Sequence, residues 1–69
     1  MLRPAALHPE RTLATPARVA GWKAGGYAVH VWTVDRDDEI VALCAAGVDG
    51  LVSNRPAAAR DAVRRATGR

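Results

Sequence analysis

Groups able to perform acid–base chemistry or to bind a metal ion are few in this 69-residue chain. Four of its seven carboxylates fall in one short run, at Asp35, Asp37, Asp38 and Glu39. A metal site needs several oxygen or nitrogen ligands that converge from strand ends or loops. The run stands where a helix is predicted to begin, and negative charge there complements the positive end of the helix dipole. We therefore interpret it as a helix start and not as a metal site.

The histidines, the cysteine and the serine form no catalytic pattern in the sequence. His8 lies in a proline-rich stretch. His30 lies inside a predicted strand, and no Cys, Asp or second His stands at a spacing that would pair it with His30. We therefore interpret His30 as a structural residue. Cys44 falls on the apolar face of a predicted helix, where we expect it to serve packing. Ser53, next to Asn54, ends a predicted strand, which is where parallel α/β folds place their chemistry. It lacks the glycine elbow of an activated nucleophile.

Local patterns predict helices that alternate with strands. Residues 1–14 read as a loop or extended lead-in. The expected elements are a helix from Thr15 (N-cap) to Ala24 stopped by Gly25-Gly26, a strand from Tyr27 to Val34, a helix capped by Asp35 and closed by Gly47, a strand from Val48 to Ser53, and a helix from Ala57 to Ala66 capped by Asn54.

The predicted strand that contains Trp32 has large side chains on both of its faces. Alternation predicts Val29, Val31 and Thr33 on one side, with the opposite side formed by His30, Trp32 and Val34. Such a strand is typical of a parallel sheet covered on both sides. Because Val29 and Val31 suit the face that packs on helices, Trp32 is expected to point away from the helices.

Two strands joined by a helical crossover pair in parallel, and the connection is expected to be right-handed. A two-stranded parallel sheet is too small to be stable alone and leaves both edges unpaired. A chain of this size also buries only about 60% of the surface that its unfolded form exposes. We therefore expect part of a larger α/β fold, whose exposed strand edges would allow self-association.

The net charge of +3 comes mainly from the C-terminal end. We interpret its arginines as a solvated helix face, with a small basic module that binds nucleic acid or an acidic partner as the alternative. No apolar run is long enough to span a bilayer, and no N-terminal signal pattern is present. A single cysteine excludes an internal disulfide. The expected location is the cytoplasm, without nucleic acid as a partner.

Two motifs at a defined separation resemble the C-terminal end of the glycerophosphodiester phosphodiesterase family. They are GGYAVHVWTVD and AAGVDGLVSNRP, and the resemblance covers about residues 7–60. It implies a (β/α)₈ TIM barrel in which Tyr27–Val34 is the seventh strand and Gly50–Ser53 the eighth. Such a barrel takes about 250 residues. Residues 1–69 are therefore expected to be a partial domain, the C-terminal quarter of the barrel.

The resemblance also implies hydrolysis of glycerophosphodiesters with a divalent cation, Ca²⁺ or Mg²⁺, held by acidic residues. The family's His-Arg-Gly and Glu-x-Asp motifs are absent from this sequence. No catalytic residue and no metal ligand can therefore be carried over, and the chain alone is expected to be inactive. Only the tryptophan of the substrate pocket has a counterpart, Trp32. The family's Thr-Asp near the last strand is Ser53-Asn54 here, which puts in doubt any role that needs a carboxylate at position 54.

A third hypothesis keeps the barrel and changes the enzyme, because Gly-Val-Asp-Gly before a last strand also suits phosphate-binding isomerases and synthases. Those enzymes place a glycine-rich phosphate loop after the last strands. The sequence Asn54-Arg55-Pro56 is not such a loop, which favours the phosphodiesterase.

Overall fold

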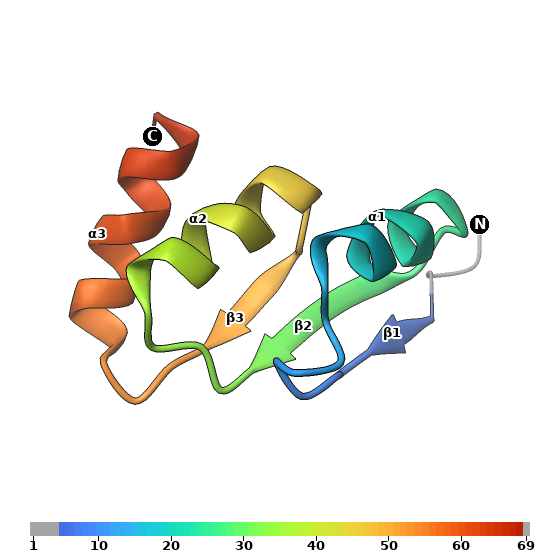
Figure 1. Ribbon diagram of the computed structural model, residues 1–69, viewed down its shortest axis with the longest axis horizontal. Helices are drawn as coiled ribbons and strands as arrows, with labels where there is room; N and C mark the ends of the chain where they lie inside the picture. Colours follow the sequence, from blue (N-terminus) through green and yellow to red (C-terminus); the bar gives the residue numbers. More distant parts are fainter. Residues whose placement is uncertain (1–4, 69) are drawn as a thin grey trace.

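The structure is a computed structural model that describes residues 5–68. Three parallel strands form one sheet in the order β1-β2-β3, and three helices alternate with them along the chain (Figure 1). The bounds are β1 Ala6–Leu7, α1 Pro16–Ala24, β2 Ala28–Trp32, α2 Asp37–Ala46, β3 Gly50–Val52 and α3 Pro56–Thr67. The predicted parallel pairing of the strands on either side of α2 is confirmed.

Strand β1 lies in the stretch that we expected to be a loop or extended lead-in, so the sheet has three strands and not two. Ala6 pairs with Ala28, and Leu7 pairs with Val29. Two residues that are followed by His8-Pro9 carry no local strand signal, and it is the pairing with β2 that makes them a strand. Residues 1–4 of the expected lead-in lie outside the described residues.

Local signals account for the start of α1 and for the end of α2. The Thr15 hydroxyl accepts a hydrogen bond from the Arg18 N–H at 3.2 Å, and Pro16 occupies the first helical position. Gly47 caps the C-terminal end of α2, and its φ of 96° lies in the left-handed region that favours glycine. Both of these predictions are confirmed.

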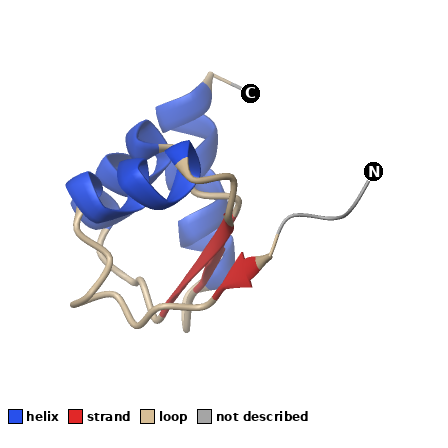
Figure 2. Ribbon diagram, turned by 90° about the vertical axis from the view of Figure 1, so that its right-hand side faces the viewer, coloured by secondary structure: helices blue, strands red, loops and turns tan. Residues whose placement is uncertain are grey.

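The buried core lies between the sheet and the helices. Val29 and Val31 of β2 are fully buried, as are Val19 of α1 and Ile40 of α2. The remaining buried residues are Ala14, Val34, Leu43, Ala59 and Ala62. Figure 2 shows all three helices on one side of the sheet. The expectation that the sheet is covered on both sides is therefore wrong for residues 5–68, in which one face of the sheet stays open.

Alternation along β2 is confirmed as far as Trp32. Val29 and Val31 are buried, whereas Trp32 is 46% exposed on the other face. Val34 was expected on the Trp32 face but is fully buried. Strand β2 ends at Trp32, so alternation no longer sets side-chain direction at Val34, whose N–H donates to the Val52 carbonyl at 2.9 Å. Thr33, expected on the helix face, is partly exposed.

Candidate functional site

The open face of the sheet carries two rows of residues near the carboxyl ends of its strands. We name it the open face and define it by Ala6, His8, Glu10, Ala28, His30, Trp32, Gly50 and Val52. Strand register places Glu10, Trp32 and Val52 in one row. The row before it contains His30 beside Gly50, with His8 next to His30 on the other side. Parallel α/β folds place their ligands at the carboxyl ends of the strands.

Trp32 ends the central strand, and its side chain is held in place. The indole N–H donates to the carbonyl oxygen of His8 at 2.7 Å. Main-chain bonds on both sides of Trp32 tie it to the segment after β1: its N–H donates to the Pro9 carbonyl at 3.2 Å, and its carbonyl accepts from the Arg11 N–H at 2.7 Å. These bonds fix a large, half-exposed ring at the carboxyl end of the sheet.

His8 and His30 meet on the open face, although nothing in their spacing predicts it. Their rings stack with centroids 5.3 Å apart and an angle of 21° between the planes. The pairing of β1 with β2 brings together two residues 22 positions apart, and only a correct assignment of β1 as a strand would have revealed it. Gly50 makes room for the His30 ring, because a Cβ atom at position 50 would clash with Nδ1 of His30.

Glu10 is a further residue of this edge that the sequence did not single out. Its carboxylate accepts hydrogen bonds from the hydroxyl of Thr12 and, at 3.2 Å, from the Thr12 N–H. These bonds, the hydroxyl bond foremost, lower the pKa of Glu10 below its ordinary value. An ionised carboxylate therefore stands beside Trp32.

The acidic run Asp35 to Glu39 divides between two structural roles. Asp37, Asp38 and Glu39 occupy the first turn of α2, as predicted. Each forms an ion pair with an arginine: Asp37 with Arg65 at 3.2 Å, Asp38 with Arg36 at 2.8 Å, and Glu39 with Arg11 at 3.3 Å. Within residues 5–68, no three His, Cys, Asp or Glu side chains gather so that they could hold a metal ion.

Asp35 links the two loops that follow β2 and β3. Its carboxylate accepts from the Ser53 hydroxyl and from the Asn54 N–H, both at 2.8 Å, and from the Asn54 side-chain amide at 3.4 Å. The Ser53 bond contributes most to lowering the pKa of Asp35. The predicted N-cap roles of Asp35 and Asn54 are wrong: Arg36 and Arg55 stand at those positions and make no side-chain cap bond. The polar groups of the two loops bond to each other instead.

This link explains how Asn replaces the expected Asp at position 54. We predict that Asn54→Asp, which sets a second carboxylate against Asp35, lowers the melting temperature by about 5 °C. The double variant Asp35→Asn with Asn54→Asp again has one carboxylate and one amide at these positions. It should recover most of the lost melting temperature. Thermal unfolding at neutral pH measures both variants. A double variant no more stable than Asn54→Asp would show that the two side chains are not coupled.

The same bonds set how acid affects stability. The folded-state pKa of Asp35 lies below its ordinary value of 3.8. The stabilisation that Asp35 gives to the folded chain is therefore complete at pH values above its ordinary pKa. It is lost as the pH falls through the lower pKa that Asp35 has in the folded state.

Asp49 and Gly47 of the Gly-Val-Asp-Gly motif have structural roles. The Asp49 carboxylate accepts from the Lys23 ammonium and from the Val29 N–H, both at 2.7 Å, and the lysine contact contributes most to lowering its pKa. The motif thus ties α1 to the start of β2 and β3.

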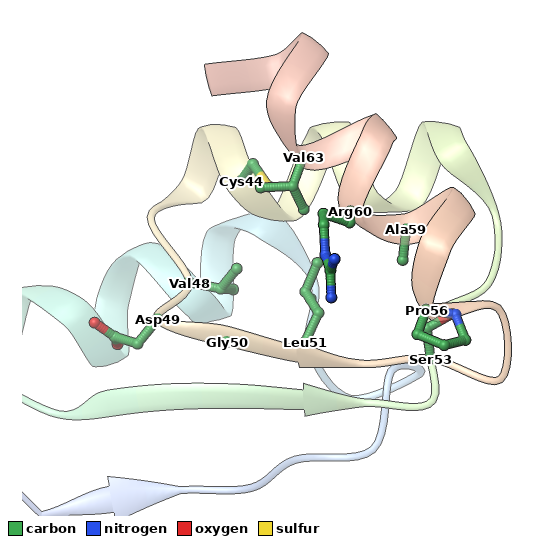
Figure 3. A pocket seen from close by; sticks show the side chains of 10 residues that line it. All are labelled: Cys44, Val48, Asp49, Gly50, Leu51, Ser53, Pro56, Ala59, Arg60 and Val63. Carbon is green, nitrogen blue, oxygen red and sulfur yellow. The ribbon is translucent and has the colours of Figure 1, made fainter. Parts of the chain in front are cut away.

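Cys44 contacts the core, and burial raises the pKa of its thiol. The prediction that it serves packing is confirmed. It also borders a cavity of about 330 Å³ between β3 and α3 (Figure 3). Figure 3 shows Val48, Leu51 and Val63 around the same space, with the Arg60 guanidinium reaching down from α3. The cavity lies beside the outer edge of β3, which no described strand pairs.

The C-terminal arginines are exposed, as expected of a solvated helix face. Arg60, Arg64 and Arg65 lie on α3, and Arg65 is paired with Asp37. Arg69 lies outside the described residues. Binding of nucleic acid through this face stays an untested alternative. None of the described helices is both long and apolar enough to cross a membrane.

The model of the glycerophosphoryl diester phosphodiesterase family matches residues 1–58. The chain belongs to this family. It is 47% identical over 47 residues to probable glycerophosphodiester phosphodiesterase 2 of Mycobacterium tuberculosis, an alignment that covers 68% of this chain and 18% of the relative. It is 36% identical over 59 residues to a glycerophosphodiester phosphodiesterase of Caldanaerobacter subterraneus, covering 86% of this chain and 24% of that one.

A solved structure of a Silicibacter pomeroyi protein assigned to the same family superposes with a TM-score of 0.74. The two are 28% identical, and the match covers 87% of this chain and 20% of the other. The chain thus spans about a fifth to a quarter of the length of the family members that it matches. Its parallel sheet with helices on one face is a segment of the family's (β/α)₈ barrel.

Proposed function

We propose that this chain supplies the C-terminal quarter of a barrel that hydrolyses glycerophosphodiesters, with Trp32 as a wall of the substrate pocket. The observation that carries the proposal is the position of Trp32 in a member of this family. It is half exposed at the carboxyl end of the central strand, on the face opposite the helices. In a barrel with its helices outside, that face is the interior, and that end is the catalytic one.

We propose further that the chain alone does not hydrolyse such substrates. The family resemblance implies a divalent cation and acid–base histidines, whereas the described residues bring together no metal-binding group. His8 and His30 stack on each other without a carboxylate hydrogen-bonded to either ring among the described contacts. The groups that cleave the diester would therefore come from the remainder of the barrel. The cytoplasmic location stays a prediction.

The test replaces the matching C-terminal segment of the Caldanaerobacter relative with this chain. We expect the 69-residue chain to show no turnover of glycerophosphocholine with Ca²⁺ or Mg²⁺, and the chimaera to hydrolyse it. The relative truncated before the exchanged segment is the matched control, and release of glycerol 3-phosphate is the readout. Turnover by the isolated chain above a metal-only blank would refute the inactive-alone proposal. A folded but inactive chimaera would refute the role in completing the barrel.

A further inference from the structure

Strand β3 is the last strand of the sheet, and its outer edge has no partner strand among residues 5–68. Such an edge presents main-chain N–H and C=O groups that can pair with a further strand. The match to the solved family structure covers 20% of that chain, and in a closed barrel every strand has a neighbour on each side. The edge of β3 is therefore a place where a further strand can add.

The cavity of about 330 Å³ between β3 and α3 opens behind this edge. Val48, Leu51 and Val63 give it an apolar lining. Leu51 pairs in register with Val31, which is buried on the helix face of the sheet. Directly paired residues on neighbouring strands point to the same face. The side chain of an added residue opposite Leu51 would therefore point toward the cavity.

Arg60 is the one cation among the described residues that line the cavity. Figure 3 shows its guanidinium reaching from α3 toward Leu51. The ion pairs found within residues 5–68 do not include Arg60. The carboxylate of the lining, Asp49, already accepts bonds from the Lys23 ammonium and the Val29 N–H, both at 2.7 Å. A carboxylate from outside is the group that complements Arg60.

A second copy of this chain does not supply that carboxylate. Two β3 edges paired around a two-fold axis perpendicular to the sheet would bring two Arg60 side chains together. The outer edge of β1 would offer Leu7 to the cavity, but the next residues on its helix side are Pro9 and Arg11, of which Arg11 pairs with Glu39 of α2. Like charges meet in both arrangements, which disfavours them.

We propose that the edge of β3 and this cavity bind an extended strand of different sequence, which places a large apolar side chain in the cavity and, two residues later, a carboxylate against Arg60. Strand addition gains affinity from main-chain bonds and specificity from alternate side chains. The inference rests on the proposed function, because the strand would belong to the part of the barrel that this chain lacks. Arg60 is then a residue that selects the partner segment, on the helix side of the sheet and away from the substrate pocket.

The test appends a strand to the C-terminus of the 69-residue chain through a Gly/Ser linker of about 15 residues, whose mean reach is about 20 Å. The strand reads Thr-Val-Thr-Leu-Thr-Glu-Thr, so that the apolar and acidic side chains share one face. We expect it to raise the melting temperature by about 5 to 10 °C over the chain with the linker alone. Alanine in place of the strand's leucine should remove most of this gain.

Exchange of the strand's glutamate for glutamine tests the contact with Arg60. It should lower the melting temperature by about 3 °C in the unmodified chain and have no effect in Arg60→Gln. Arg64→Gln is the matched control, because Arg64 lies one turn further along α3 and outside the cavity lining, and it should keep the difference. Cys44 gives a local readout, since the leucine strand should slow its reaction with a thiol reagent several-fold relative to the alanine strand.

No gain in melting temperature over the linker alone would overturn the proposal, as would equal gains with the leucine and alanine strands. A preference for glutamate that persists in Arg60→Gln would also overturn it. If the unmodified chain sediments as a dimer that the appended strand abolishes, the edge belongs to a second copy instead. A folded but inactive chimaera, with the gain and its dependence on Arg60 intact, would refute the proposed function and leave the strand site standing.

Discussion

Replacing Val31 with aspartate is expected to unfold the chain, whereas the same substitution at Val52 is expected to leave it folded. Val31 is fully buried on the helix face of β2. Val52 lies one position further along the neighbouring strand, in register with Trp32, and is 56% exposed on the open face. The two sites therefore test the same chemical change on opposite sides of one sheet.

The expected free-energy costs of the two substitutions differ enough to give different outcomes. An uncompensated buried charge costs about 3 to 5 kcal/mol, and the core of a domain this small rarely supplies more than about 3 to 5 kcal/mol of net stability. The Val31 substitution should therefore remove all or most of the stability. At an exposed strand position the loss of a β-branched residue costs up to about 1 kcal/mol, which Val52→Asp should survive.

Far-ultraviolet circular dichroism and urea unfolding followed by tryptophan fluorescence measure both variants. A folded Val31→Asp variant together with an unfolded Val52→Asp variant would contradict the strand register. A slip of one residue in a strand exchanges its two faces, so this pair of variants reads the register directly.

The second large effect concerns activity in the chimaera. Trp32→Ala is expected to lower kcat/KM for glycerophosphocholine about 10- to 100-fold, because loss of the proposed pocket wall would let the substrate move away from the reactive geometry. Tyr27→Ala is the matched control. Tyr27 is also exposed but precedes β2, at the amino end of the strands, where barrels carry stability and not chemistry.

Steady-state kinetics and melting temperatures of both variants are the measurements. The Tyr27 variant should keep kcat/KM within about threefold of the unmodified chimaera. Equal losses of kcat/KM in the two variants would contradict the placement of Trp32 in the pocket. If the loss of kcat/KM in the Trp32 variant were fully explained by a lower melting temperature, Trp32 would serve packing and not the pocket.

The predictions that hold are those made by short-range patterns. Thr15-Pro16 begins α1, and Gly47 ends α2, because a side-chain cap and a left-handed glycine act within one helical turn. The faces of β2 follow from alternation, which holds as long as the strand lasts. It fails at Val34, two residues past the strand end.

The predictions that fail at the two helix starts involve partners far along the chain. Asp35 and Asn54 each stand just before a helix and have the right side chain for a cap. They bond to each other across 19 residues instead, because the parallel strands bring their two loops together. At both positions a tertiary hydrogen bond to the Asp35 carboxylate replaces a local helix cap. The sequence of either segment alone does not predict this bond.

The sequence by itself determined the helices, the parallel pairing on either side of α2, the direction of Trp32 and the resemblance to the family. Each of these depends on residues within one element or on two motifs at a defined separation. Only the tertiary structure decided that Ala6–Leu7 is a strand, that His8 stacks on His30, and that Glu10 lies beside Trp32. These features arise when β1 pairs with β2, and the energy of that pairing comes from contacts more than twenty residues apart.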